Sequence, residues 1–190
     1  MALAVVLAGG VPPTRRDAAS LKQKVDAINE LAEKSAKVPR KQPRRTVITE
    51  NELNAYFLFD AAKDLPVGVI NPAISILGPG RLTGRAIVDL DAVRKASPPK
   101  SLLDPKNLLI GRLPLTATGV LTTSNGTATF ALESANVGNL PLPKILLDEI
   151  VSYYSRSPGR PGGVSIDDAF MLPAGIREIQ VTRGQAVIIQ

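Results

Sequence analysis

The side chains best suited to chemistry in this chain are acidic, and two pairs of carboxylates stand close together. Asp89 and Asp91 alternate within an extended pattern, so they are expected on one face of a strand, and Asp167 and Asp168 are adjacent. Such pairs could contribute to a calcium site, but a hard cation takes about six or more oxygen ligands. No other acidic cluster lies nearby in the sequence. We therefore expect both pairs at a solvated surface and predict no metal site.

The residue types that are missing exclude most catalytic templates. The 190 residues include no histidine, no cysteine and no tryptophan, which removes the commonest general base, the thiol nucleophile and the usual zinc ligands. The spacing of Gly78, Gly80 and Gly84 is similar to that of a phosphate loop, but such a loop must open a helix and here a strand pattern follows. The sequence therefore predicts a protein that is not an enzyme and needs no cofactor.

The net charge of +6 is concentrated near the N-terminus. Residues 1–46 contain ten basic and four acidic side chains, whereas the remaining 144 residues contain thirteen of each. Because the body is balanced, we expect no nucleic-acid binding. The proline-containing segment VPRKQPRR is expected to be an extended linker without regular structure. It is interpreted either as a solvated tether or as a contact with an anionic membrane surface through Lys37, Arg40, Lys41, Arg44 and Arg45.

The chain begins with the apolar run MALAVVLAGG, which is too short to cross a bilayer, since a spanning helix needs about twenty residues. Residues 1–16 are interpreted as a truncated secretory signal or a disordered segment, because small residues follow the apolar run but the usual basic start is missing. We accordingly expect a periplasmic or otherwise exported protein, with membrane association left open.

An amphipathic helix is predicted over residues 17–37, where apolar side chains recur at helical spacing: Leu21, Val25, Ile28, Leu31 and Ala32. With the basic linker it forms a segment 17–46 ahead of a single domain over residues 47–190. The apolar stripe must be buried somewhere, and docking to a protein partner is one interpretation.

The domain opens with a second helical signal. Thr49 and Glu52 form a capping box, which predicts a helix from Glu50. This helix carries three of the seven aromatic residues of the chain, Tyr56, Phe57 and Phe59. A further helix is expected to begin near Pro143.

The remaining signals are those of antiparallel hairpins. Asn125-Gly126 lies between two alternating runs and is the preferred two-residue hairpin turn. Residues whose numbers sum to 251 then face each other, which sets Leu121 against Phe130 and Gly119 against Leu132. A shorter hairpin is expected around Arg183-Gly184. The predicted fold class is therefore α+β, with a long curved antiparallel sheet of hairpins, one or two helices that could cover its apolar face, and the N-terminal helix.

The apolar face of this sheet and the facing helices give a set of candidate residues. They are either ordinary core or the lining of a groove for an acyl chain, and the sequence leaves both readings open. The set consists of Leu53, Tyr56, Phe57, Leu121, Phe130, Leu132, Leu147, Ile150 and Tyr154.

From Thr49 to Gln190 the chain resembles the LmeA-like and YceB-like groups of bacterial envelope proteins, which are related in fold to the tubular lipid-binding (TULIP) proteins. The segments that carry the resemblance are TENELNAYF, GNLPLPKILL and LPAGIREIQVTRGQAVIIQ. It implies a TULIP-like half-barrel in which the first helix of the domain forms a wall opposite the sheet. It also implies an envelope protein that binds or transfers phospholipid or another amphiphile in an apolar groove, without catalysis. The alternative is a structural or scaffold protein of the envelope, with a filled core, that binds a protein partner through residues 17–37.

Overall fold

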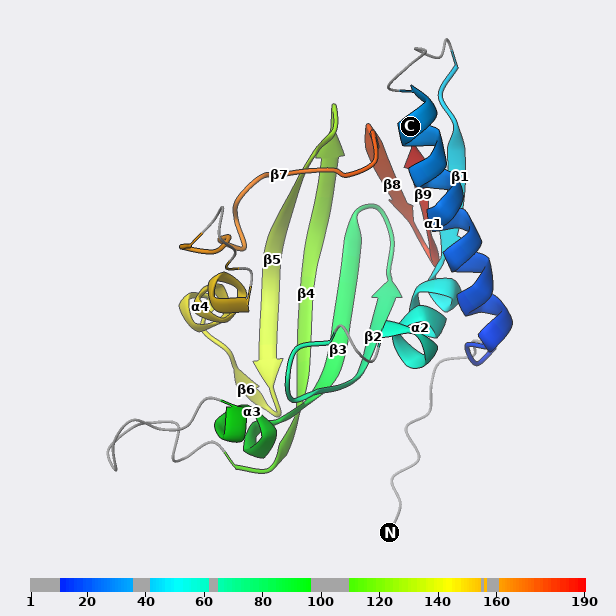
Figure 1. Cartoon of the computed structure of the whole chain (residues 1–190). Helices are drawn as coiled ribbons and strands as arrows, with labels where there is room; N and C mark the ends of the chain where they lie inside the picture. Colours follow the sequence, from blue (N-terminus) through cyan, green and yellow to red (C-terminus); the bar gives the residue numbers. More distant parts are fainter. Residues whose placement is uncertain (1–10, 36–41, 62–64, 97–109, 155, 157–160) are drawn as a thin grey trace.

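A computed structural model describes residues 11–35, 42–61, 65–96, 110–154, 156 and 161–190. This part of the chain forms two antiparallel sheets and four α-helices, as Figure 1 shows. The helices are α1 (Arg15–Ser35), α2 (Glu50–Phe59), α3 (Leu90–Ala96) and α4 (Lys144–Tyr154). The expected α+β class is confirmed.

The larger sheet is long and antiparallel, as predicted, and has six strands, of which five run in the order β2-β3-β4-β5-β6. A short strand, β7, pairs with the other end of β5. The strands are β2 (Val69–Ile76), β3 (Arg81–Asp89), β4 (Arg112–Ser124), β5 (Thr127–Val137), β6 (Leu140–Pro141) and β7 (Phe170–Met171). The strand β2 therefore forms one edge of this sheet.

The central hairpin β4-β5 has the predicted turn and register. Asn125 and Gly126 both have positive φ, 50° and 79°, as a turn of this type requires. Leu121 lies opposite Phe130 and Gly119 opposite Leu132. The register shifts between Thr118 and Gly119, so the predicted pairing holds from the turn to Gly119 but not in the half of the hairpin farther from the turn.

The smaller sheet joins segments from the two ends of the described chain, in the order β1-β9-β8. Its strands are β1 (Arg45–Thr49), β8 (Glu178–Thr182) and β9 (Gln185–Ile189). The hairpin β8-β9 was expected, but β1 was not. Arg45 was predicted to lie in a linker without regular structure, and this is wrong: it pairs with Ile189, and the backbone of Arg44 is bonded to Gln190 in both directions, at 3.1 and 3.0 Å.

The helix α1 lies alongside the smaller sheet (Figure 1). Leu21 and Ile28 share one buried cluster with Ile48 of β1 and Ile188 of β9. Leu31 is buried too, whereas Val25 is 41% exposed. Most of the apolar stripe predicted for this helix is therefore covered by the protein itself, which gives the helix its tertiary stabilisation.

The helix α2 begins with the predicted capping box, in which Thr49 and Glu52 bond reciprocally. Its buried positions are Glu52 and Ala55 rather than its aromatic residues. Tyr56 is 37% exposed. The helix lies beside the edge strand β2, as the hydrogen bonds described below establish.

The helix α3 replaces the end of a strand that was expected to continue through Asp91. Asp89 is the last residue of β3, and its Oδ1 accepts a hydrogen bond of 2.9 Å from the N–H of Ala92. A carboxylate in this position caps a helix start. The expectation that Asp89 and Asp91 share a strand face is therefore wrong, because the chain turns into a helix between them.

Candidate functional site: an apolar pocket at the β2 edge

The outer edge of β2 is closed by side chains of α2. Asn54 donates from Nδ2 to the carbonyl of Ile74, at 2.8 Å, and its Oδ1 accepts from the N–H of Ile74, at 2.7 Å. Glu50 accepts from the N–H of Ile76, at 2.7 Å. An open strand edge exposes backbone groups to pairing with other chains. The two side chains satisfy this part of the edge and fix α2 against it.

Nearer the start of β2, the pairing of the strand with β3 is irregular. The register with β3 shifts between Ile70 and Ala73, and Asn71 has a positive φ of 49°. The residue after it, Pro72, has no N–H to donate, which suits an edge strand and a bulge. None of the hydrogen bonds described for α2 reaches the backbone at this point, whereas the Asn54 side chain bonds to the backbone of Ile74.

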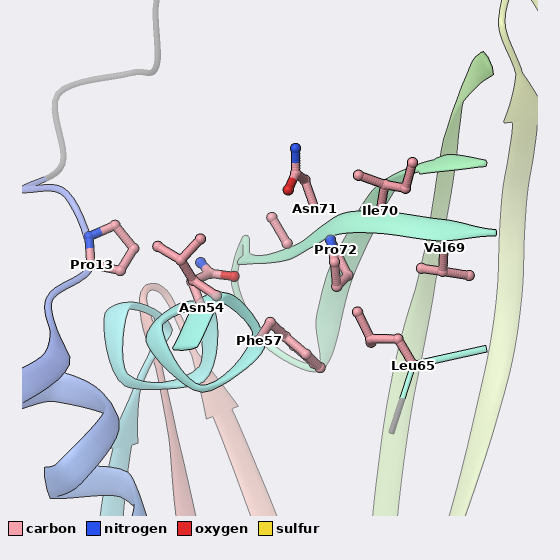
Figure 2. A pocket seen from close by; sticks show the side chains of 10 residues that line it. Pro13, Asn54, Phe57, Leu65, Val69, Ile70, Asn71 and Pro72 are labelled. Carbon is pink, nitrogen blue, oxygen red and sulfur yellow. The ribbon is translucent and has the colours of Figure 1, made fainter. Parts of the chain in front are cut away.

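A pocket of about 410 Å³ lies at this bulge. Figure 2 shows it between the segment that precedes α1, the helix α2 and the edge strand, with Phe57 extending from α2 toward Leu65. Its lining consists of Pro13, Asn54, Phe57, Leu58, Leu65, Val69, Ile70, Asn71, Pro72 and Ala73. None of these side chains is charged, and the amide of Asn54 is already committed to Ile74. The lining is therefore suited to an apolar ligand.

The pocket adjoins the apolar face of the larger sheet. Val69 lines the pocket and also lies opposite Val88 in the ladder between β2 and β3. Side chains at alternate positions of a strand, and directly opposite each other in a ladder, share a face. The face that includes Val69 and Val88 also carries Ile74, Leu82, Ala86, Leu113, Leu115, Ala117, Leu132, Ala135 and Val137. Except for Ala135, these side chains keep partial solvent exposure, whereas Ile76 and Ala128, on the same face, are buried.

The structure describes the side chains of seven of the nine candidate residues predicted from the sequence. Of the nine, Phe57 lines the pocket. Its ring lies 5.9 Å, between centroids, from that of the exposed Tyr56. Leu53 and Leu121 pack against the same two buried clusters.

The other predicted positions are distributed over the sheet and α4. Phe130 and Leu132 are half-buried on β5, and Leu147 is buried on α4. The side chains of Ile150 and Tyr154 lie outside the described part of the structure.

Sequence reasoning missed most of the pocket lining. One signal was available, because Asn71-Pro72 interrupts an otherwise strand-like run, VINPAISI. A proline inside such a run marks an edge strand or a bulge. The participation of Pro13 depends on how α1 docks, which no local pattern reports.

Two of the five basic residues proposed for membrane contact belong to the described part of the chain. Lys37, Arg40 and Lys41 lie outside the described residues. Arg44 and Arg45 are exposed at the start of β1, and Arg45 donates from Nη2 to Gln180 Oε1 at 2.6 Å.

The carboxylates singled out in the sequence are held by ordinary surface contacts. Asp89 bonds to Arg112 at 2.9 Å, and Asp167 to Lys144 at 2.6 Å. The N–H of Ala92 and the Arg112 guanidinium hold the pKa of Asp89 below its ordinary value. Among the residues that the structure describes, no group of three or more acidic side chains is arranged to hold a metal ion.

The described elements define an α+β protein with a long antiparallel sheet and an apolar pocket at its edge. No helix in the described ranges combines the length and the apolar character needed to cross a membrane. Comparison of the chain with protein-family models, curated proteins and solved structures finds no significant match.

Proposed function

We propose that this protein binds an amphiphile, such as a phospholipid, with an acyl chain in the pocket at the β2 edge. The observation that carries the proposal is the uncharged lining of the pocket and its continuity, through Val69, with the apolar face of the larger sheet. Binding sites for small molecules are mostly apolar and have volumes of about 300–1,000 Å³. The volume of this pocket, about 410 Å³, lies within that range.

The driving force would be burial of apolar surface. Each Å² of apolar surface removed from water contributes about 25 cal/mol. An acyl chain in the pocket would cover Phe57 and Leu58, and one that continued past Val69 would cover half-exposed side chains of the sheet face. A short polar ligand would gain little from the same lining.

The finer parts of the proposal rest on the resemblance described for residues 49–190, on the apolar run at the N-terminus and on the missing residue types. They are a TULIP-like curl of the larger sheet, a location in the cell envelope after export, transfer as well as binding of the lipid, and the absence of catalysis. The competing reading is an envelope scaffold that binds a protein partner through residues 17–37. That reading is weakened because Leu21 and Ile28 are already buried against the smaller sheet.

Native mass spectrometry of gently purified protein, with lipid extraction and a delipidated control, tests this proposal. We expect a stoichiometric lipid that is lost in Leu58→Asp, a change at a pocket residue that is 57% exposed and therefore tolerant of substitution. Phe57→Asp is a second pocket variant. Tyr56→Asp is the matched control, because it adds the same charge to α2 at a position that does not line the pocket.

A protein that remains free of lipid after incubation with phospholipid vesicles would contradict the proposal. So would a lipid that Leu58→Asp and Tyr56→Asp release equally, since that lipid would then be bound elsewhere. Circular dichroism of each variant establishes that the comparison is made between folded proteins.

A further inference from the structure

The pocket at the β2 edge reaches both faces of the larger sheet. Val69 lies opposite Val88 on the apolar face, whereas the next lining residue, Ile70, lies opposite Ile87 on the other face. Figure 2 shows the side chains of Ile70 and Asn71 on one side of the strand and that of Val69 on the other. A ligand that fills the pocket and continues past Val69 along the apolar face therefore has its other end beside Ile70 and Asn71.

Of the two asparagines in the lining, Asn71 is the one whose side chain is available to a ligand. The amide of Asn54 is committed to Ile74 through both of its polar atoms. Within the part of the chain that the structure describes, the amide of Asn71 forms no hydrogen bond, and this residue is exposed. A free amide offers two N–H donors and one acceptor oxygen. A ligand can therefore bond to Asn71 without breaking a contact within the protein.

The backbone places Asn71 firmly at this position. The flanking residues are paired with β3, Ile70 with Ile87 and Ala73 with Arg85, so the strand is held on both sides of the bulge. Asn71 has a positive φ of 49°, a conformation that asparagine adopts more readily than most residues. Glycine would adopt it without strain. The conformation therefore does not by itself require a polar side chain at the pocket.

The group that suits a free amide at this place is an acyl carbonyl. None of the side chains that line the pocket is charged. A charged group drawn into such a site would lose hydration without gaining a partner, so the polar group of the ligand that enters it is neutral. The carbonyl of an ester or an amide is neutral, accepts a hydrogen bond, and stands directly at the root of an acyl chain.

We infer that Asn71 determines the specificity of the pocket by donating a hydrogen bond from Nδ2 to the carbonyl at the root of an acyl chain. This inference rests on the proposed function and specifies its ligand class, lipids with an ester-linked or amide-linked chain. The chain runs past Val69 onto the apolar face, and the headgroup stays in solvent beyond Asn71. An ether-linked chain of the same length gains the burial but not the hydrogen bond.

Displacement of Nile red, a neutral apolar dye that fluoresces when bound in an apolar site, tests the inference. The competitors share one chain length and one headgroup: ethylene glycol monopalmitate is the ester, N-palmitoylethanolamine the amide and 2-hexadecyloxyethanol the ether. We expect the ester and the amide to displace the dye at about three- to tenfold lower concentration than the ether, because one hydrogen bond between neutral groups is of that order. The stronger of these two competitors identifies the favoured linkage.

The variants separate recognition of the carbonyl from binding of the chain. Asn71→Gly permits the positive φ but removes the amide, so the three competitors should become equivalent while the ether binds as before. Asn71→Asp has no N–H to donate and should lose the preference too. Asn125→Gly is the matched control, because Asn125 also has a positive φ, 50°, but lies in the β4-β5 turn and does not line the pocket. Thermal unfolding shows whether each variant is folded.

The failures are distinguishable. Equal displacement by the three competitors in the wild type overturns the role of Asn71 while the proposed function stands. So does a preference that survives in either Asn71 variant, or one that Asn125→Gly abolishes as well. Dye bound in the pocket should be released by Leu58→Asp. Absence of dye binding, or dye that Leu58→Asp leaves bound, overturns the proposed function and this inference with it.

Discussion

The Nζ atom of Lys24 on α1 lies 2.6 and 2.8 Å from the two carboxylate oxygens of Glu52 on α2. The same carboxylate accepts hydrogen bonds from Ser20 Oγ, at 2.5 Å, and from the N–H of Thr49, at 2.8 Å. The Glu52 side chain is only 7% exposed. One carboxylate therefore completes the capping box of α2 and also fastens α1, and through α1 it holds Pro13 in place.

Replacing Glu52 should destabilise the fold. Glu52→Gln keeps the size of the side chain but leaves the ammonium of Lys24, which is 30% exposed, without its partner. We expect the free energy of unfolding to fall by about 2–3 kcal/mol, measured by urea denaturation. Glu30→Gln removes an exposed ion pair with Lys34 and should change the free energy of unfolding by less than about 0.5 kcal/mol. Equal effects of the two changes would mean that the ion pair of Glu52 stabilises the fold no more than an exposed ion pair does.

The stabilisation from Glu52 should depend on pH. Burial raises the pKa of its carboxyl group, but the hydrogen bonds from Lys24, Ser20 and the backbone of Thr49 outweigh burial and lower the pKa below the ordinary 4.5. A pKa that is lower in the folded state gives stabilisation that is complete above the unfolded value and is lost as the pH falls through the folded value. Urea titrations should therefore show a constant gap between wild type and Glu52→Gln near neutral pH and a shrinking gap below pH 4.5. A gap that already closes near neutral pH would contradict this assignment.

The edge of the larger sheet should depend on the amide of Asn54. Asn54→Asp keeps the acceptor for the N–H of Ile74 but places a carboxylate oxygen against the carbonyl of Ile74. We expect a loss of about 1–2 kcal/mol in the free energy of unfolding, and increased light scattering as the edge becomes open to other chains. Asn29→Asp is the control, since Asn29 is exposed on α1 and a substitution at such a position should change stability by less than about 0.5 kcal/mol. Unchanged stability and solubility of Asn54→Asp would show that the edge is protected in another way.

The sequence predicted the parts of the fold that depend on local chemistry. The turn at Asn125-Gly126 requires positive φ at both positions, and the pair of Thr49 and Glu52 specifies a helix start, so neither needs information from elsewhere. The register of the upper half of β4-β5 followed from the turn.

The arrangements that were missed depend on contacts between distant segments. The pairing of Arg45 with Ile189 joins the two ends of the described chain, and an isolated strand of five residues beside two prolines carries no signal for its partner. The pocket has the same origin, because Pro13, Phe57 and Pro72 meet only after α1 and α2 have docked. Apolar periodicity marked the buried side of α1 but could not tell whether the protein or a partner covers it.

Two glycines in the larger sheet should respond in opposite directions to a single added methyl group. The ring of Phe130 lies over Gly119, and a Cβ there would contact that ring and lie 2.7 Å from the carbonyl oxygen of Ala131. Gly119→Ala should therefore lower the free energy of unfolding by about 1–3 kcal/mol. Gly84, on the neighbouring strand, has no atom within 4 Å of the corresponding position and an ordinary φ. Gly84→Ala should raise stability by about 0.4–1 kcal/mol, because alanine restricts the unfolded chain.

The combination of Gly119→Ala with Phe130→Leu tests the cause of this loss. The smaller side chain removes the contact with the ring but leaves the carbonyl of Ala131 in place. Gly119→Ala should therefore cost less stability in the Phe130→Leu background than in the wild type, but the cost should not disappear. If Gly119→Ala and Gly84→Ala had the same sign in urea denaturation, the ring of Phe130 would not occupy the space above Gly119. The packing of Phe130 against β4 would then differ from the one described.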